Sequence, residues 1–263
     1  MTPMEAAALT GADQPSALRM ATYFSSERKQ VRGFLTDGAA AVMIAVLKLQ
    51  AEQGIFGHMA EIGTYHGKTF IGLALALRNE ERLLGVDIFE ERGSDFEPSL
   101  RANYRAFGIP DEKIRLHRGP STGLNIPQWQ ALVQGPARFI HVDGDHTRKA
   151  VYHDLTLAAS SLVPGAVILV DDVFHPWFPD VTLGLLDFLS HEQDLSVVAL
   201  IDRQGPLING GPKMLLSKRS DFARYRKILI EQMRPNIVRE ATFDRHRILV
   251  MSFDQGVTWP KQA

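Results

Sequence analysis

The feature that most constrains the fold is a regular alternation of short apolar segments with segments of helical periodicity. The apolar segments are rich in Val, Ile, Leu and Phe, and they have few polar residues on either face. Strands of this kind must be covered on both sides, as in the parallel sheets of α/β proteins. The sequence therefore predicts an α/β fold with a doubly wound, Rossmann-like sheet and helices on both faces.

The expected elements follow one another from residue 37 onward. Strands are expected at 58–63, 82–90, 114–119, 137–144 and 166–172, and helices at 37–54, 67–80, 97–108, 147–162 and 181–190. Asp37 is placed to cap the first helix and Gly54 to end it. This helix is apolar on most of its circumference, so we expect it to lie between other elements or at a subunit contact.

Two further strands, at 196–202 and 213–219, are separated by a turn rich in Gly and Pro, which predicts an antiparallel hairpin at the far edge of the sheet. We divide the chain into three parts. Residues 1–36 are polar, rich in Ala and aperiodic, and are expected to form an arm or lid. Residues 37–220 form the main domain, and 221–263 add an extension with one helix and one strand, 247–253, packed on the same domain.

Composition excludes several classes of function. The 29 Lys and Arg residues nearly balance the 30 Asp and Glu residues, so no basic field draws the chain to nucleic acid or to anionic lipid. The chain has 0 cysteines, which excludes disulfides, thiolate-bound metals and a thiol nucleophile. No signal peptide is recognisable, and no apolar run approaches the roughly 18 residues of a membrane span. We therefore expect a soluble cytoplasmic protein.

The expected strands end in acids. Asp87 ends the second strand and Asp143 the fourth, whereas the pair Asp171 and Asp172 ends the fifth. Ligands of open parallel sheets bind outside these carboxyl ends. Neighbouring strands lie about 4.8 Å apart, so acids from the fourth and fifth strands can converge on one ion. Oxygen ligands favour Mg²⁺, Mn²⁺ or Ca²⁺, although such acids also serve as helix caps.

The segment EIGTYHGKT, residues 61–69, lies between the first strand and its helix. Gly63 and Gly67 let backbone amides approach a ligand at a helix N-terminus. The spacing differs from the G-x-G-x-x-G of dinucleotide-binding turns, which argues against a dinucleotide oxidoreductase. Glu61 suits a cationic ligand, and Asp87 at the end of the next strand is placed to bind the two hydroxyls of a ribose.

The run HVDGDH, residues 141–146, has two interpretations. It nearly reproduces the His-x-His-x-Asp-His zinc-binding run of metallo-β-lactamase-like hydrolases. That class needs a histidine where Asp143 stands, a β-rich preceding half and further histidines downstream. We therefore favour the end of a parallel strand, in which Asp143 binds metal and His141 is a satisfied buried histidine with little functional role.

Five stretches in this order resemble class I S-adenosylmethionine (SAM)-dependent methyltransferases, specifically the metal-dependent O-methyltransferases of small molecules. They are EIGTYHGKT, GVDIFE, HRGPS, FIHVDGDH and VILVDDVF, which together span about residues 58 to 175. The resemblance implies a seven-stranded sheet of order 3-2-1-4-5-7-6. It implies SAM binding by Glu61, Gly63, Thr64, Tyr65, Gly67, Thr69, Asp87, Ser121 and Asp143. The family usually has an acid before that serine, where this chain has Pro120.

The resemblance also implies that Asp143, Asp171 and Asp172 bind Mg²⁺ or Mn²⁺. His146, three residues after Asp143, is then the general base, and its ordinary pKa near 6.5 suits that role. Catechol and caffeoyl-CoA methyltransferases are less similar, because they have Asp-x-x-Lys and Asp-Asn at these positions. Macrolide-sugar and related sugar O-methyltransferases, with a histidine base and paired acids, are more similar.

We therefore predict a metal-assisted O-methyltransferase whose partner is a small hydroxylated acceptor, first a saccharide and second a phenolic or catechol-like compound. A SAM-binding regulator without catalysis is an alternative of a different class. His175, Trp177 and Phe178 follow the paired acids and are placed to line the acceptor pocket or to pack in the core. A homodimer or higher homo-oligomer is a further expectation.

Overall fold

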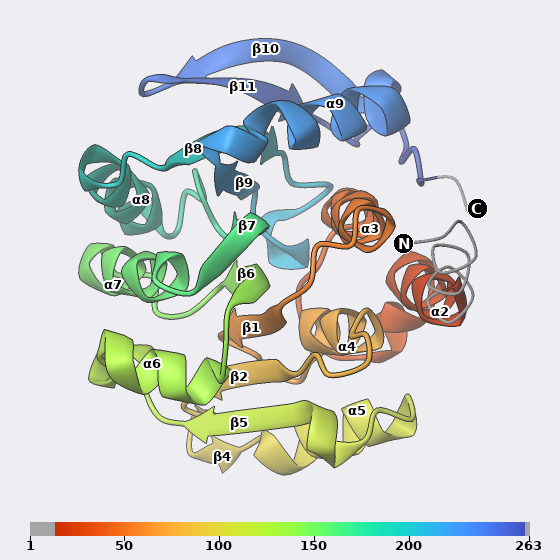
Figure 1. Cartoon of the computed structure of the whole chain (residues 1–263), viewed down its shortest axis with the longest axis vertical. Coiled ribbons are helices and arrows are strands. Elements are labelled where there is room, and N and C mark those ends of the chain that lie inside the picture. The colour runs from red at the N-terminus through yellow and green to blue at the C-terminus, as the bar shows by residue number, and fades with distance from the viewer. Residues whose placement is uncertain (1–13, 261–263) are drawn as a thin grey trace, which may run out of the picture.

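The computed structural model describes residues 14–260, and its centre is a nine-stranded sheet (Figure 1). The strands are β1 His58–Ile62, β2 Leu83–Asp87, β5 Ile114–Arg118, β6 Ala137–Val142, β7 Leu162–Val170, β8 Leu195–Ile201, β9 Lys213–Lys218, β10 Ile237–Phe243 and β11 His246–Met251. Their order is β10-β11-β8-β9-β7-β6-β1-β2-β5. All neighbours pair in parallel except β9 with β7 and β8, and β10 with β11. A separate hairpin pairs β3 Glu90–Glu91 with β4 Ser94–Asp95.

The Rossmann-like fold and the order 3-2-1-4-5-7-6 are confirmed for the strands from β5 to β8. The strand count of seven is wrong, because β11 pairs in parallel with β8 and β10 completes a hairpin with β11. The hairpin of β8 and β9 therefore lies inside the sheet and not at its far edge. β10 was not expected, since most of its residues are exposed and its apolar pattern is weak.

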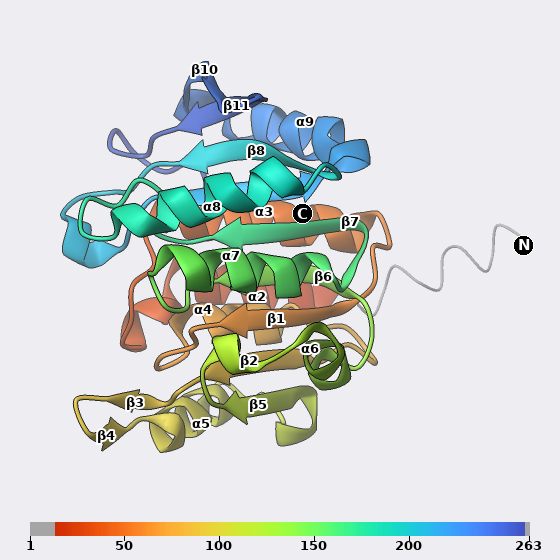
Figure 2. The same cartoon turned by 90° about the vertical axis from the view of Figure 1, so that its left-hand side faces the viewer.

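Helices cover both faces of the sheet. They are α2 Gln14–Ser25, α3 Asp37–Glu52, α4 Lys68–Leu75, α5 Glu97–Ala106, α6 Ile126–Val133, α7 Arg148–Ala159, α8 Pro179–His191 and α9 Phe222–Met233. α6, α7 and α8 lie on one face (Figure 2), and α3, α4 and α9 lie on the other. A hydrophobic core fills each side of the sheet. No helix within residues 14–260 has the length and apolarity to cross a bilayer.

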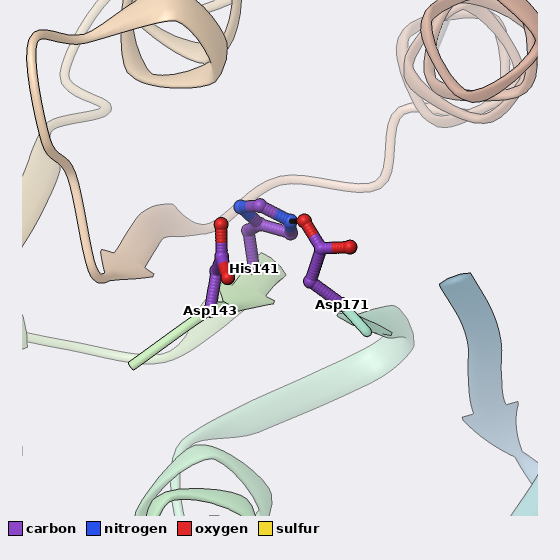
Figure 3. A group of neighbouring side chains, drawn as sticks. All are labelled: His141, Asp143 and Asp171. Atoms are coloured by element: carbon purple, nitrogen blue, oxygen red, sulfur yellow. Dashed lines mark ion pairs between the residues drawn. The ribbon is translucent and has the colours of Figure 1, made fainter. Parts of the chain in front are cut away.

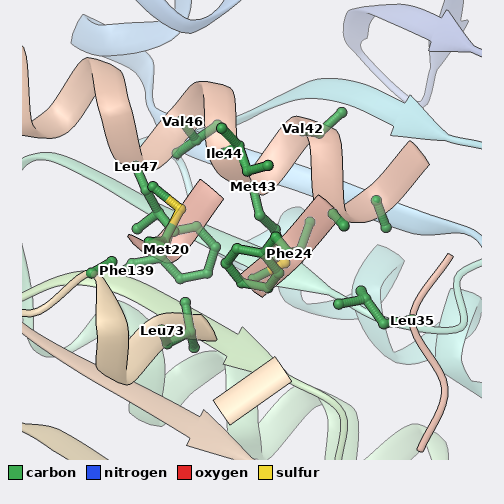
Figure 4. Close-up of a cluster of buried hydrophobic side chains, with 14 of the residues drawn as sticks. Met20, Phe24, Leu35, Val42, Met43, Ile44, Val46, Leu47, Leu73 and Phe139 are labelled. Atoms are coloured by element: carbon green, nitrogen blue, oxygen red, sulfur yellow. The ribbon is translucent and has the colours of Figure 1, made fainter. Parts of the chain in front are cut away.

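Helix α3 is buried on almost all sides. It packs between α2 and α9, and the buried cluster beneath it includes Met20, Phe24 and Phe139 (Figure 4). The apolar circumference is thus explained within one chain, so it no longer argues for a subunit contact, and a homo-oligomer stays a prediction. The expected cap is wrong by one residue, because the side chain of Thr36 accepts the hydrogen bond from the Ala39 amide.

The N-terminal region has more structure than its sequence predicted. Residues 14–25 form α2, and Tyr23 and Phe24 are fully buried. The description of residues 1–36 as aperiodic is therefore wrong from residue 14 onward, whereas 1–13 lie outside the described residues. A role as a lid stays a prediction.

Candidate active site

The parallel strands β1, β2 and β6 end at one edge of the sheet, where the following turns enclose a cavity of about 500 Å³. This volume is within the usual range of ligand-binding pockets. Of the residues expected to bind SAM, those that line the cavity are Glu61, Gly63, Thr64, Tyr65, Thr69, Asp87, Ser121 and Asp143. Gly67 is the N-cap of α4, at the end of the same turn.

The turn after β1 depends on its glycines. Gly63 has φ +84°, and a Cβ there would lie 1.7 Å from the carbonyl oxygen of Asp143. Only glycine therefore allows the ends of β1 and β6 to approach so closely. Tyr65 has φ 47°, a left-handed conformation that is uncommon for a side chain of this size. The turn is held in an unusual conformation where it meets the cavity.

Asp87 fixes this turn to the end of β2. One of its oxygens, Oδ2, accepts hydrogen bonds from the amides of Thr64 at 2.7 Å and Tyr65 at 2.9 Å. The other, Oδ1, accepts one from the amide of Phe89 at 2.9 Å. A carboxylate has about four acceptor positions. Oδ2 also accepts a hydrogen bond from the Thr64 hydroxyl at 3.3 Å, so its positions are used. Oδ1 has one donor and keeps a position for a ribose hydroxyl.

Glu61 presents an acceptor to the cavity. Its side chain is 2% exposed, and Oε1 lies 2.8 Å from Nδ1 of His141. Oε2 has no hydrogen-bond partner within the described part of the chain. Burial, and then the charge of Asp143, raise the pKa of Glu61 well above its usual value. A buried acceptor without a partner fits the cationic methionine end of SAM, so these residues fit the cofactor.

His141 is not the satisfied histidine that was expected. Its Nδ1 contacts Glu61, but Nε2 has no hydrogen-bond partner in the described residues and lies 3.7 Å from Oδ2 of Asp171 (Figure 3). Burial, and then the nearby charge of Lys213, lower the pKa of His141 to about 3. The imidazole is therefore neutral. β6 pairs with both β1 and β7, which places His141 between two acid-bearing strands.

The three acids expected to bind metal fall into two overlapping groups of possible ligands. His141, Asp143 and Asp171 form one, and Asp143, His146 and Asp172 form the other. Within each group the ligand atoms lie within 4.8 Å of one another. Asp143 thus belongs to both groups, whereas Asp171 and Asp172 belong to different ones.

His146 lies between two carboxylates. Its Nε2 is 3.1 Å from Oδ2 of Asp172 and 3.7 Å from Oδ1 of Asp143, and its ring stacks on Phe178 with centroids 4.0 Å apart. Burial opposes protonation of His146, but the two acids outweigh it and raise its pKa to about 10. Burial, and then Asp171, raise the pKa of Asp143 to about 8.

The pKa of Asp172 is shifted in the opposite direction to that of Asp143. Burial alone would raise the pKa of Asp172, but His146 and Lys213 lower it below its usual value. Asp172, like Tyr65, is a non-glycine residue of the site in the left-handed region, with φ 58°. Backbone strain of this kind concentrates at functional sites.

Lys213 is a site residue that the sequence analysis missed. It is 1% exposed, and its Nζ forms an ion pair with Oδ2 of Asp171. Burial opposes its charge, but Asp171 and Asp143 keep its pKa above the usual value. The sequence feature that could have identified it is a lysine at the first position of an otherwise apolar strand. In the order 5-7-6 this strand, β9, runs antiparallel beside β7. The first residue of β9 therefore lies beside the carboxyl end of β7, where Asp171 follows.

Other expected residues have structural roles. Oδ1 of Asp145 accepts a hydrogen bond from the Thr147 amide at 2.9 Å, just before α7. Asp154 on α7 is fully buried and packs against Gly144, so it is a packing residue. His175 is buried and stacks on Phe178, whereas Trp177 is 60% exposed.

The donor set fits a hard divalent cation. Asp143 and Asp172 offer carboxylate oxygens, the ligands that Mg²⁺ and Mn²⁺ prefer. Their side chains are 30% and 13% exposed, so they are open to a ligand, and Asp143 lines the cavity itself. Asp143 therefore lines the cofactor cavity, and the ligand atom of Asp172 lies within 4.8 Å of that of Asp143.

The fold and the ordered motifs agree with the resemblance to class I SAM-dependent methyltransferases that the sequence indicated. Residues 60–173 match a family model described as a methyltransferase domain. The match begins in β1 and ends just after the paired acids. A comparison with curated proteins gave no match.

Solved O-methyltransferases share the fold. TomG from Streptomyces achromogenes, solved with SAM, has a TM-score of 0.54 and 21% identity over 77% of this chain and 89% of its own. The O-methyltransferase from Bacillus cereus, solved with SAH, has a TM-score of 0.56 and 16% identity over 78% of this chain and 91% of its own. The O-methyltransferase NovP has a TM-score of 0.54 and 14% identity over 77% of this chain and 97% of its own. The prediction of a methyltransferase agrees with the family model, and the solved O-methyltransferases share its fold.

Proposed function

We propose that this chain is a divalent-metal-assisted O-methyltransferase that transfers the methyl group of SAM to a hydroxyl of a small molecule, with a saccharide as the first candidate acceptor. One observation carries the proposal. Asp143 lines the cofactor cavity and also belongs to one ligand group with His146 and Asp172. A methyl donor bound in the cavity would therefore end beside residues that can hold and deprotonate a hydroxyl.

The proposed cofactor-binding roles are supported by the positions of Glu61, Asp87 and Ser121 around the cavity. Glu61 holds the cationic methionine end, Asp87 accepts hydrogen bonds from the ribose, and Ser121 lies beside the adenine. When bound, SAM supplies an electrophilic methyl group. The carboxylates and turn amides orient the two reactants in line, and such orientation accounts for much of the rate of a displacement.

The acid–base roles belong to the metal-binding edge. Asp143 and Asp172 would hold the cation, which when bound supplies Lewis-acid polarisation of the acceptor hydroxyl. His146 accepts the hydroxyl proton at Nε2. Its position between two carboxylates favours the protonated form unless their charges are offset. Neutralisation of Asp143 and Asp172 therefore goes together with the use of His146 as a base.

Aromatic side chains beside the site support a saccharide acceptor. The rings of His146, His175 and Phe178 stack in one row, and Trp177 next to them is 60% exposed. The exposed ring of Trp177 offers a flat face of the kind that suits the apolar face of a sugar ring. The histidine base and the paired acids are also the features that resemble sugar O-methyltransferases. A phenolic acceptor fits the same faces and is the second candidate.

The test is a methyl-transfer assay with glycosides and catechols as acceptors, each with Mg²⁺ and with excess chelator. We expect methylation of glycosides that requires the metal. Unchanged turnover in chelator would overturn the metal role, and a preference for catechols would overturn the saccharide. Cofactor binding without turnover on any acceptor would favour a regulator.

A further inference from the structure

Lys213 places a positive charge inside the predicted metal site. β9 runs antiparallel to β7 with Val170 opposite Met214, so Lys213 comes to lie beside Asp171. Its ammonium group pairs with Oδ2 of Asp171, and both side chains are almost fully buried, at 1% and 6% exposure. The chain itself therefore supplies a counter-charge where the sequence argument required a metal ion.

Both oxygens of Asp171 have partners within the chain. Oδ1 accepts a hydrogen bond from the amide of Asp172 at 2.8 Å, and Oδ2 contacts Lys213. A buried charge is tolerated when it is paired and its remaining positions are satisfied. Binding of a cation to Asp171 would require the Lys213 ammonium to leave this contact, which would strand a buried charge.

Asp143 and Asp172 are in a different situation. Both are partly exposed, and the charged side chain nearest to them is His146, at 3.7 Å and 3.1 Å. His146 is itself 34% exposed, so its side chain can move away without leaving a buried charge. These two carboxylates are therefore available to an incoming cation.

We infer that Asp171 is not a metal ligand in this chain, because Lys213 acts as a resident cation on it, and that the divalent ion is held by Asp143 and Asp172. The inference rests on the metal assistance proposed above. Mg²⁺ is commonly bound through one or two carboxylates and keeps several waters. The site so formed has one acid fewer and one positive charge more than a three-acid site, which makes its metal weakly held and exchangeable.

The test measures binding of Mn²⁺ to the full chain by electron paramagnetic resonance, without acceptor. The informative variant is Asp171→Asn/Lys213→Met, which removes one acid and one base and leaves the net charge unchanged. We expect its Mn²⁺ affinity to stay within about threefold of wild type. Asp172→Asn locates the ion, and we expect it to lose at least about tenfold in affinity.

A second variant, Lys213→Met, frees Asp171 as a third carboxylate and removes the repulsive charge. We expect it to bind Mn²⁺ at least about tenfold more tightly than wild type, and to gain more thermal stability from Mn²⁺. A tenfold loss of affinity in Asp171→Asn/Lys213→Met would show that Asp171 is a ligand and overturn the inference. Unchanged or weaker binding by Lys213→Met would overturn it as well.

Two remaining outcomes show whether the inference and the proposed function fail separately or together. If wild type does not bind Mn²⁺ but Lys213→Met does, the role of Lys213 is supported and metal assistance is removed from the proposed function. If neither protein binds Mn²⁺ while both still bind SAH, both the inference and the metal role are overturned.

Discussion

Nδ1 of His141 lies 2.8 Å from Oε1 of Glu61, across the neighbouring strands β6 and β1 in which these residues are paired. Because burial keeps the imidazole neutral, this contact does not supply a positive charge to Glu61. It fixes the orientation of the carboxyl group of Glu61, which lines the cavity and whose Oε2 has no hydrogen-bond partner among the described residues. The histidine that seemed least important thus positions the residue expected to hold the cofactor.

The first prediction concerns Glu61→Gln. A hydrogen bond to a charged group contributes about 1.5 to 3 kcal/mol, so we expect SAM to bind about 10- to 100-fold more weakly. Isothermal titration calorimetry measures this directly. Glu91→Gln is the matched control, because Glu91 lines the same cavity at its exposed rim, and we expect it to change the affinity less than threefold. Equal effects of the two substitutions would contradict the role of Glu61.

The second prediction is that His146→Ala lowers kcat by about 10²- to 10⁴-fold, the usual contribution of a general base. Affinity for SAM should stay close to wild type and affinity for Mn²⁺ should not fall, because neither role is assigned to His146. His191→Ala, on the exposed end of α8, is the matched control and should retain full turnover.

Two results would refute this assignment of His146. Near-normal turnover in His146→Ala would show that another group accepts the proton. A large loss of Mn²⁺ affinity together with the loss of kcat would show that His146 is a metal ligand instead.

The sequence predicted the acids at the site better than the groups that neutralise them. The acids could be placed because an acid that ends a parallel strand lies at a known edge of the sheet, whatever the details of packing. The partner of Asp171 depends instead on the antiparallel register of β9 against β7, which brings Lys213 to that edge. Hydrophobic periodicity finds a strand but does not give its register to one residue.

The fold, too, was predicted from the sequence in part. The parallel, doubly wound sheet followed from the alternation of strands and helices, which short connections and right-handed crossovers restrict to few topologies. The strand order from β5 to β8 came from the resemblance to the methyltransferase family. β10 and α6 were missed for local reasons. β10 is mostly exposed, and α6 has only 8 residues, although its capping box of Asn125 and Gln128 was visible in the sequence.

The third prediction concerns stability at the amino-terminal edge of the sheet. Glu81 is fully buried and accepts hydrogen bonds from Arg138 at 2.8 and 2.9 Å and from Arg78 at 2.9 Å. Glu81→Gln leaves two buried guanidinium groups short of a counter-charge. We expect a loss of about 3 to 5 kcal/mol in unfolding free energy, measured by urea denaturation. Glu80→Gln, next to it but exposed, should change stability by less than about 0.5 kcal/mol.

The last prediction is a pH dependence of stability that arises from Asp154. Neither carboxyl oxygen has a hydrogen-bond partner among residues 14–260. Burial raises the pKa of Asp154 to about 7, Asp145 adds to the rise, and Ser121 partly opposes it. In the unfolded chain the pKa of an aspartate is about 3.9. Between these two values the folded protein therefore holds a proton on Asp154 that the unfolded chain has lost.

Because the folded state binds more protons in this range, the unfolding free energy contributed by Asp154 falls as pH rises from about 4 to about 7 and is constant above. Asp154→Asn removes this pH-dependent contribution to the unfolding free energy. Relative to wild type, the variant should gain about 2 to 3 kcal/mol between pH 5 and pH 8, measured by urea denaturation at each pH. Asp180→Asn, an exposed acid at the start of α8, is the control, and its stability should run parallel to wild type. A parallel course for Asp154→Asn as well would mean that Asp154 is already ionised in the folded protein, with a partner that offsets its burial.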